Sequence, residues 1–198
     1  MAKKTNIRKS PFHDANHWMY WGIAQAHLRL AHRSFGVYTM LLERAATQGI
    51  PVNKEWFLAV NEATQSATIA TVFAGLAAEA YINHLAIEKL DTFRLEGLDK
   101  LTTEMKWVIV PKLIYRKGIE PSSHVVEGLK RLAKLRNQLV HFKSKPLRMP
   151  LNPTRLEARV RDAEGAVKGV SEAIKALHRI DPKFEKYRVE LLLNNGGK

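Results

Sequence analysis

The stretch from residue 54 to residue 90 constrains the fold of this chain most, because it combines helical spacing with many small side chains. Apolar residues recur in it at intervals of three and four, which lines up one face of an α-helix, at Ile69, Val72, Phe73, Leu76, Ala80 and Tyr81. Five further alanines are small enough to let a neighbouring helix approach closely, namely Ala67, Ala70, Ala74, Ala77 and Ala78. The pattern predicts one long helix with a wide apolar surface, or two helices joined near Ala63.

Helical spacing also covers most of the remaining chain, and no segment alternates apolar and polar residues as a half-buried strand does. We expect core helices at about residues 14–48, 54–90, 104–116, 124–142 and 154–180, with a short last helix from Pro182. Asp14, Thr154 and either Ser122 or Ser123 are suitable N-caps, and Pro111 is expected to kink or divide its helix. The sequence therefore predicts an all-α fold, with a basic flexible arm over residues 1–12 and a single helical domain over residues 13–198.

The composition excludes several classes of function. The absence of cysteine rules out disulfides, a cysteine nucleophile and thiolate metal sites. His17, His27 and His32 do not form a metal-ligand pair on one helical face beside an acid, so we expect no metal and no cofactor. No apolar run approaches about 18 residues, and the basic N-terminus has no apolar segment typical of a secretory signal. The sequence predicts a cytoplasmic protein without a membrane span.

The positive charge of the chain is concentrated in two short segments. Of a formal net charge of +13, residues 1–10 carry +4 and residues 130–161 carry +9, because ten basic residues there accompany the single acid Glu157. Such a concentration is typical of a protein that binds a polyanion such as RNA, since each phosphate contact releases counterions. A solubilising basic surface and a surface for anionic lipid are the alternatives.

Within the second basic segment, residues 132–143 place polar side chains on a helix that is otherwise amphipathic. Arg136 projects into the middle of the apolar face, where a guanidinium needs a partner, a cleft or a ligand. Asn137 and His141 are four residues apart and share another face, and His141 lies roughly 140° around the helix from Arg136. At about 100° per residue, the apolar face consists of Val125, Leu129, Leu132, Leu139 and Val140.

These residues, in the stretch LAKLRNQLVHFK, resemble the Arg-x4-6-His signature of the HEPN superfamily. The upstream segment AAEAYINHLA also resembles the second core helix of such domains. The resemblance is specific over these short stretches and only topological elsewhere. It implies a HEPN-like up-and-down helical bundle with additional helices, often a homodimer. It also implies the activity of many members, which are metal-independent endoribonucleases of toxin–antitoxin and phage-defence systems.

The resemblance assigns roles to individual residues. Arg136 would hold the phosphate, His141 would transfer protons, and Asn137 would donate to the phosphate or orient the imidazole. Glu79 and Asn83, one helical turn apart, would pair with Arg136 or orient His141. A homodimer would supply a second His141 to each cleft. The concentration of positive charge around the motif predicts further side chains that bind the RNA, namely Lys130, Arg131, Lys134, Lys143, Lys145 and Arg148.

The sequence departs from the family at one position and leaves other interpretations open. Toxins with a tyrosine-modifying antitoxin often have a tyrosine two residues after the histidine, and Lys143 occupies that position here, so an antitoxin of that kind is not expected. An antitoxin protein of another kind stays among the partners that the resemblance implies. A non-catalytic helical dimer can bind RNA or a nucleotide with the same basic surface. In a purely structural interpretation, Arg136 pairs with Glu79 across the bundle. Arg8 and His13 repeat the motif spacing, but in a proline-containing tail without helical periodicity.

Overall fold

The computed structural model describes residues 16–49, 54–91, 95, 97–140 and 153–184. These residues form helices, turns and bends, and no strand occurs among them, which confirms the all-α prediction. The expected arm over residues 1–12, the last two residues of the expected helix 124–142 and the chain beyond residue 184 lie outside the described residues.

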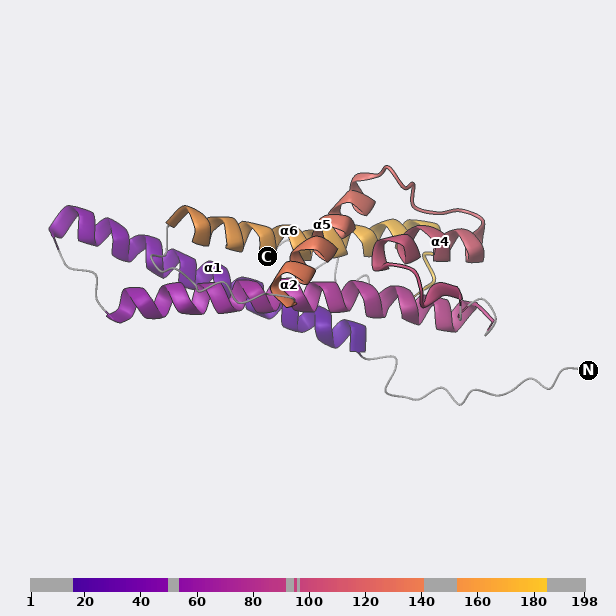
Figure 1. Ribbon diagram of the computed structural model, residues 1–198, viewed down its shortest axis with the longest axis horizontal. Helices are drawn as coiled ribbons and strands as arrows, with labels where there is room; N and C mark the ends of the chain where they lie inside the picture. Colours follow the sequence, from indigo (N-terminus) through magenta and orange to yellow (C-terminus); the bar gives the residue numbers. More distant parts are fainter. Residues whose placement is uncertain (1–15, 50–53, 92–94, 96, 141–152, 185–198) are drawn as a thin grey trace, which may run out of the picture.

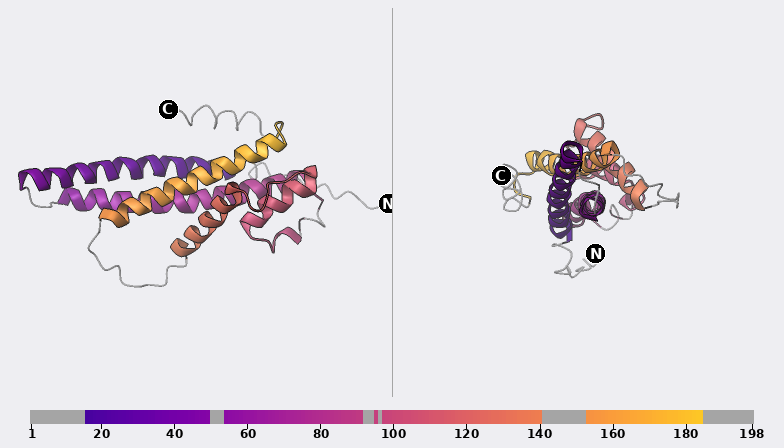
Figure 2. Two further views of the ribbon diagram at one scale, coloured as in Figure 1. Left: turned by 90° about the horizontal axis from the view of Figure 1, so that it is seen from above. Right: turned by 90° about the vertical axis from the view of Figure 1, so that its left-hand side faces the viewer.

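Three long helices form the body of the molecule: α1 (Asn16–Gln48), α2 (Lys54–Lys89) and α6 (Pro153–Ile180). Each of the three packs against the other two, and Figure 1 shows them running along the longest axis, with α1 antiparallel to α2. The shorter helices α4 (Thr103–Tyr115) and α5 (His124–Val140) cover the later half of α2. Figure 2 shows α5 crossing the long helices obliquely. One end of α5 therefore meets the middle of α2, which positions the candidate site.

The helix α2 is continuous, without a break near Ala63, and it contacts every other labelled helix. The five alanines expected to permit close approach are all buried, between 0% and 2% exposed, so α1 and α6 pack close to α2. Among the described residues, α2 is the one helix long and apolar enough to cross a membrane. Over half of its most apolar window, 56%, is buried in the fold, as in the core helix of a bundle.

The helix ends follow local chemistry. Gly49 ends α1 in the left-handed conformation at φ +66°, and its N–H donates to the carbonyl of Ala45. Ser123 caps α5, because its Oγ accepts a hydrogen bond from the N–H of Val126 at 3.4 Å. The expected cap Thr154 lies inside α6, which begins one residue earlier at Pro153, since a proline loses no hydrogen bond at the first helical position.

The structure departs from two expectations about the shorter helices. Pro111 was expected to kink or divide its helix, and it does not divide it, because α4 continues to Tyr115 and ends at Arg116 in the left-handed conformation at φ 56°. Val140 was expected on the core face of α5, yet its side chain is 56% exposed. The oblique crossing explains this exposure: Val125, Leu129 and Leu132 are buried, whereas the last turn of α5 extends beyond the core.

Candidate functional site around Arg136

Arg136 lies where α5 crosses α2, and its side chain rests on Gly75. A Cβ atom added to Gly75 would lie 2.7 Å from Cδ and 3.4 Å from Cγ of Arg136. Real Cβ contacts are essentially never shorter than 3.0 Å. Only glycine at position 75 therefore leaves room for the aliphatic part of Arg136 in this conformation, which explains how an arginine fits within an apolar helix face.

The guanidinium of Arg136 is held by Glu79, one helical turn along α2 from Gly75. Its Nη1 donates to Oε2 of Glu79 at 3.2 Å, and the two side chains are 30% and 37% exposed. The expected pairing is present, and neither partner is buried. The contact engages one guanidinium N–H of the five that an arginine possesses, so donors remain for a second acceptor.

Asn83 was expected to pair with Arg136 or orient His141; among the described residues its side chain bonds to Lys106, and His141 lies outside them. Oδ1 of Asn83 accepts a hydrogen bond from Nζ of Lys106 on α4 at 3.0 Å, and Lys106 is only 6% exposed. Glu79 and Asn83 are four residues apart, which is about 6 Å along a helix axis. Two positive side chains from two different helices thus contact neighbouring turns of α2.

Sequence reasoning missed Lys106, although a signal was present. Lys106 interrupts the otherwise apolar run MKWVIV, just as Arg136 interrupts the apolar face of α5. Its neighbour Trp107 fixes the rotation of α4, because the indole Nε1 donates to the carbonyl of Ala78 at 3.0 Å and its ring stacks on Tyr81. Because Trp107 contacts one side of α2 at Ala78, its neighbour Lys106 can reach Asn83 on a different side of the same helix.

The remaining predicted site residues divide into two groups. Asn137 and Lys134 are exposed on α5, while Lys130 pairs with Glu127 on the same helix and Arg131 pairs with Asp162 on α6, both at 2.7 Å. The others lie outside the described residues, namely His141, Lys143, Lys145 and Arg148. Of the motif, the structure therefore describes Arg136 and Asn137, both on α5, but not His141.

The histidines of α1 are dispersed. His17 is buried and stacks on His84 of α2, with ring centroids 5.0 Å apart, whereas His32 is exposed and lies 4.0 Å from Glu164. Within the described ranges, no three histidine or carboxylate side chains are gathered as a metal ion would require.

The arrangement can bind an anion at Arg136. A phosphate approaching the guanidinium would meet donors whose direction is set by Glu79 and Gly75, and a planar guanidinium can bind two phosphate oxygens at once. Lys106 places a second positive charge one turn further along α2.

In comparisons with known proteins, the chain matches no family model, no curated protein and no solved structure.

Proposed function

We propose that this chain is a HEPN-like, metal-independent endoribonuclease that acts on RNA as a homodimer, as a cytoplasmic toxin or phage-defence effector. The observation that carries the proposal is the setting of Arg136. It is partly exposed, it is oriented by Glu79 over Gly75, and it lies five residues before His141 in the most basic part of the sequence. A guanidinium held in one direction but not buried is suited to binding a phosphate that comes from solvent.

The proposed reaction uses the nucleophile that RNA itself carries. The 2′-oxygen forms a bond to phosphorus while its proton passes to one His141, and the bond from phosphorus to the 5′-oxygen breaks as that oxygen takes a proton from a second His141. The second histidine comes from the other protomer. Arg136 stabilises the extra negative charge on the phosphorus centre, and Asn137 donates to the phosphate or holds the imidazole. The products are a 2′,3′-cyclic phosphate and a 5′-hydroxyl.

Cleavage of total RNA in the presence of EDTA tests this proposal. Arg136→Ala and His141→Ala should each lower cleavage by at least about a hundredfold, the usual size of a general acid–base or electrostatic contribution, while His141→Ala still binds RNA. Arg33→Ala on α1 and His124→Ala at the opposite end of α5 are matched controls, because both side chains are exposed. Cleavage that persists in both motif variants would show that a different site or a contaminating nuclease is responsible.

A second candidate function is a non-catalytic RNA-binding module. The Arg136–Glu79 ion pair favours it, because the pair compensates the charge of Arg136 without any ligand. This candidate predicts RNA binding that weakens with salt and no cleavage by the unaltered chain in EDTA. If RNA does not bind at all, the ion pair has a structural role only.

A further inference from the structure

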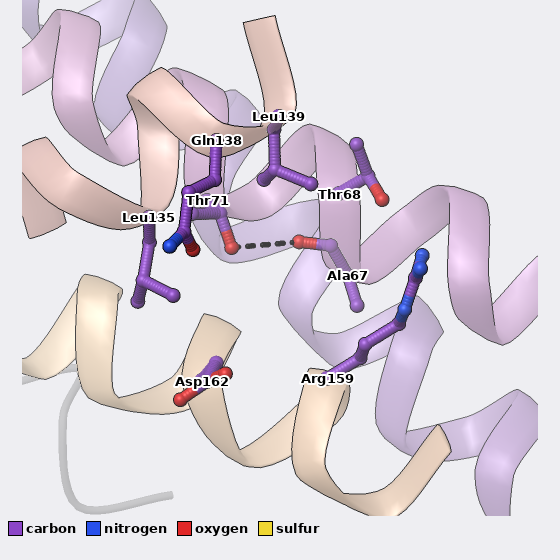
Figure 3. Close-up of a pocket in the computed structure, with 8 residues that line it drawn as sticks. All are labelled: Ala67, Thr68, Thr71, Leu135, Gln138, Leu139, Arg159 and Asp162. Carbon is purple, nitrogen blue, oxygen red and sulfur yellow. Dashed lines mark hydrogen bonds between the residues drawn. The ribbon is translucent and has the colours of Figure 1, made fainter. Parts of the chain in front are cut away.

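A pocket of about 230 Å³ lies beside the candidate site, between α2, α5 and α6. Figure 3 shows residues of all three helices around it, including Thr68 and Thr71 of α2 and Gln138 of α5. Thr71 is one helical turn from Gly75, and the pocket residue Leu139 is three residues from Arg136. The pocket is therefore about 6 Å along α2 from the seat of Arg136.

The walls of the pocket combine apolar surface with polar groups that can still form hydrogen bonds. Leu135 and Leu139 supply apolar surface from α5. The hydroxyls of Thr68 and Thr71 each donate to a carbonyl of α2, at 2.8 and 2.9 Å, so each hydroxyl oxygen keeps the capacity to accept a hydrogen bond. Thr68 is the more accessible of the two, because Thr71 is only 3% exposed. Gln138 is exposed and adds an amide donor and an amide acceptor. Apolar walls with a few oriented polar groups are typical of a small-molecule site.

The charge at the pocket favours an anionic ligand. Arg159 of α6 is exposed at its edge, and no hydrogen bond or ion pair joins it to another described residue. Figure 3 shows its guanidinium turned up toward the side where Thr68 lies. The one acid in the lining, Asp162, is bonded to Arg131 at 2.7 Å, so its charge is compensated. Among the residues that the structure describes, the pocket therefore presents a positive charge at Arg159 that no carboxylate compensates.

From this combination we infer that the pocket binds a single nucleobase of the RNA strand, with Arg159 on the adjoining phosphate or stacked against the base. The inference rests on the proposed function for the identity of the strand. Pockets for drug-sized ligands occupy about 300–1,000 Å³, and this smaller volume suits one base. RNA-binding proteins recognise sequence mostly in unstacked bases that enter such sites. A phosphate at Arg136 would place a neighbouring nucleotide here, so the pocket selects the base beside the cleaved bond.

The test is a titration of the full chain with AMP, CMP, GMP and UMP. Binding is monitored by the NMR signals of leucine methyl groups. The methyl signals of Leu135 and Leu139 should shift with at least one nucleotide, and less with ribose 5-phosphate, which lacks a base. Arg159→Ala should weaken nucleotide binding about tenfold, the effect of one lost charge-assisted hydrogen bond. Gln138→Leu should reduce the differences in affinity among the four nucleotides.

Arg161→Ala is the matched control, because Arg161 is also an exposed arginine of α6 but pairs with Glu157. It should change nucleotide binding by less than about twofold, as expected for loss of a screened surface charge. Unchanged leucine signals with all four nucleotides, equal shifts with ribose 5-phosphate, or equal effects of the two arginine variants would each overturn the inference. Because binding is measured without cleavage, a pocket that binds nucleotide in a chain that cuts no RNA would uphold the pocket and refute the nuclease.

Discussion

At the scale of single residues, Arg136 shows how a charged side chain is accommodated on an apolar helix face. Its aliphatic part lies on Gly75 and its guanidinium reaches Glu79 at the edge of the core, where both side chains are about one-third exposed. An ion pair with this exposure contributes roughly 0–1 kcal/mol to stability. The chief consequence of Glu79 is therefore the direction of the guanidinium.

Gly75→Ala tests this steric arrangement. The new Cβ would meet Cδ of Arg136 at 2.7 Å, so the arginine must leave its present position. Alanine in place of glycine in a helix gains up to about 1 kcal/mol, which offsets part of the strain, so we expect a small change in thermal stability but at least tenfold slower RNA cleavage, measured with a fluorescent oligonucleotide. Gly165→Ala is the control, because nothing lies within 4 Å of its added Cβ. Normal cleavage by Gly75→Ala would show that the position of Arg136 does not matter.

Glu79→Gln tests separately whether Glu79 acts by orienting the Arg136 guanidinium or through its own negative charge. The amide oxygen can still accept from Arg136, but the negative charge that competes with phosphate is gone. We expect RNA affinity to rise about two- to fivefold, equivalent to roughly 0.5–1 kcal/mol for one partly exposed charge interaction, as measured by fluorescence anisotropy. Glu43→Gln, an exposed acid of α1, should leave the affinity unchanged. Weaker binding by Glu79→Gln would mean that the carboxylate itself contributes to the RNA site.

At the scale of elements, α4 and α6 are joined at their ends by Tyr115 and Asp181. The Tyr115 hydroxyl donates to Oδ2 of Asp181 at 2.7 Å, and Oδ1 accepts from the backbone N–H groups of Lys183 and Phe184. Burial raises the pKa of Asp181, but these hydrogen bonds and the charge of Lys89 outweigh burial, so its pKa is lowered. The pKa of Tyr115 is raised, mainly by burial and to a smaller extent by its hydrogen bond to Asp181 and by the negative charge of Asp181.

The direction of the Asp181 pKa shift gives the sign of this one carboxylate's contribution to the pH dependence of stability. Because the folded state lowers this pKa, the carboxylate stabilises the fold above the ordinary aspartate pKa of 3.8, and that stability is lost as the pH falls through the folded value. Asp181→Asn should therefore destabilise the chain by about 1–2 kcal/mol at pH 7. Urea unfolding should show the difference from the unaltered chain shrinking below about pH 4. A difference that stays constant down to pH 3 would contradict this account.

At the scale of the whole molecule, the proposed site is incomplete in one protomer, because each Arg136 has a single His141 beside it in sequence and the reaction needs both a base and an acid. Light scattering at micromolar concentration should give a mass of twice the 22.5 kDa chain. Specific cleavage activity should fall on dilution, as the dimer dissociates. A monomer that retains full activity would exclude the composite site.

The distribution of charge makes a separate prediction about RNA affinity. The logarithm of the binding constant for single-stranded RNA should fall linearly with the logarithm of salt concentration, by about 0.7 for each phosphate contact. Lys134→Ala, which removes an exposed lysine of α5 two residues before Arg136 in the sequence, should reduce the magnitude of this slope by about 0.7. Lys168→Ala, which removes an exposed lysine of α6, should leave the slope unchanged. Equal slopes for both variants would place the RNA elsewhere.

The sequence by itself determined the fold class, the approximate bounds of the helices and most of the residues that they bury. Helical spacing placed the bounds of α2 within one residue, and Ala67, Ala70 and Ala74 were correctly expected in close contacts. These features follow from periodicity along one segment, which needs no knowledge of neighbours. The effect of Pro111 and the exposure of Val140 depend instead on neighbouring helices. A helix on a packed surface can continue past a proline that would divide an isolated helix, and the crossing angle decides where a buried face ends.

The tertiary structure alone decided which side chains meet. The sequence offered both Glu79 and Asn83 as residues that could pair with Arg136 or orient His141; in the structure Arg136 donates to Glu79, and Asn83 accepts from Lys106. Neither the Lys106–Asn83 hydrogen bond nor the pocket beside Arg159 is a property of one segment, since each requires side chains from separate helices. Spacing along a chain fixes the direction of a side chain relative to its own helix, whereas distances between helices depend on how their surfaces pack.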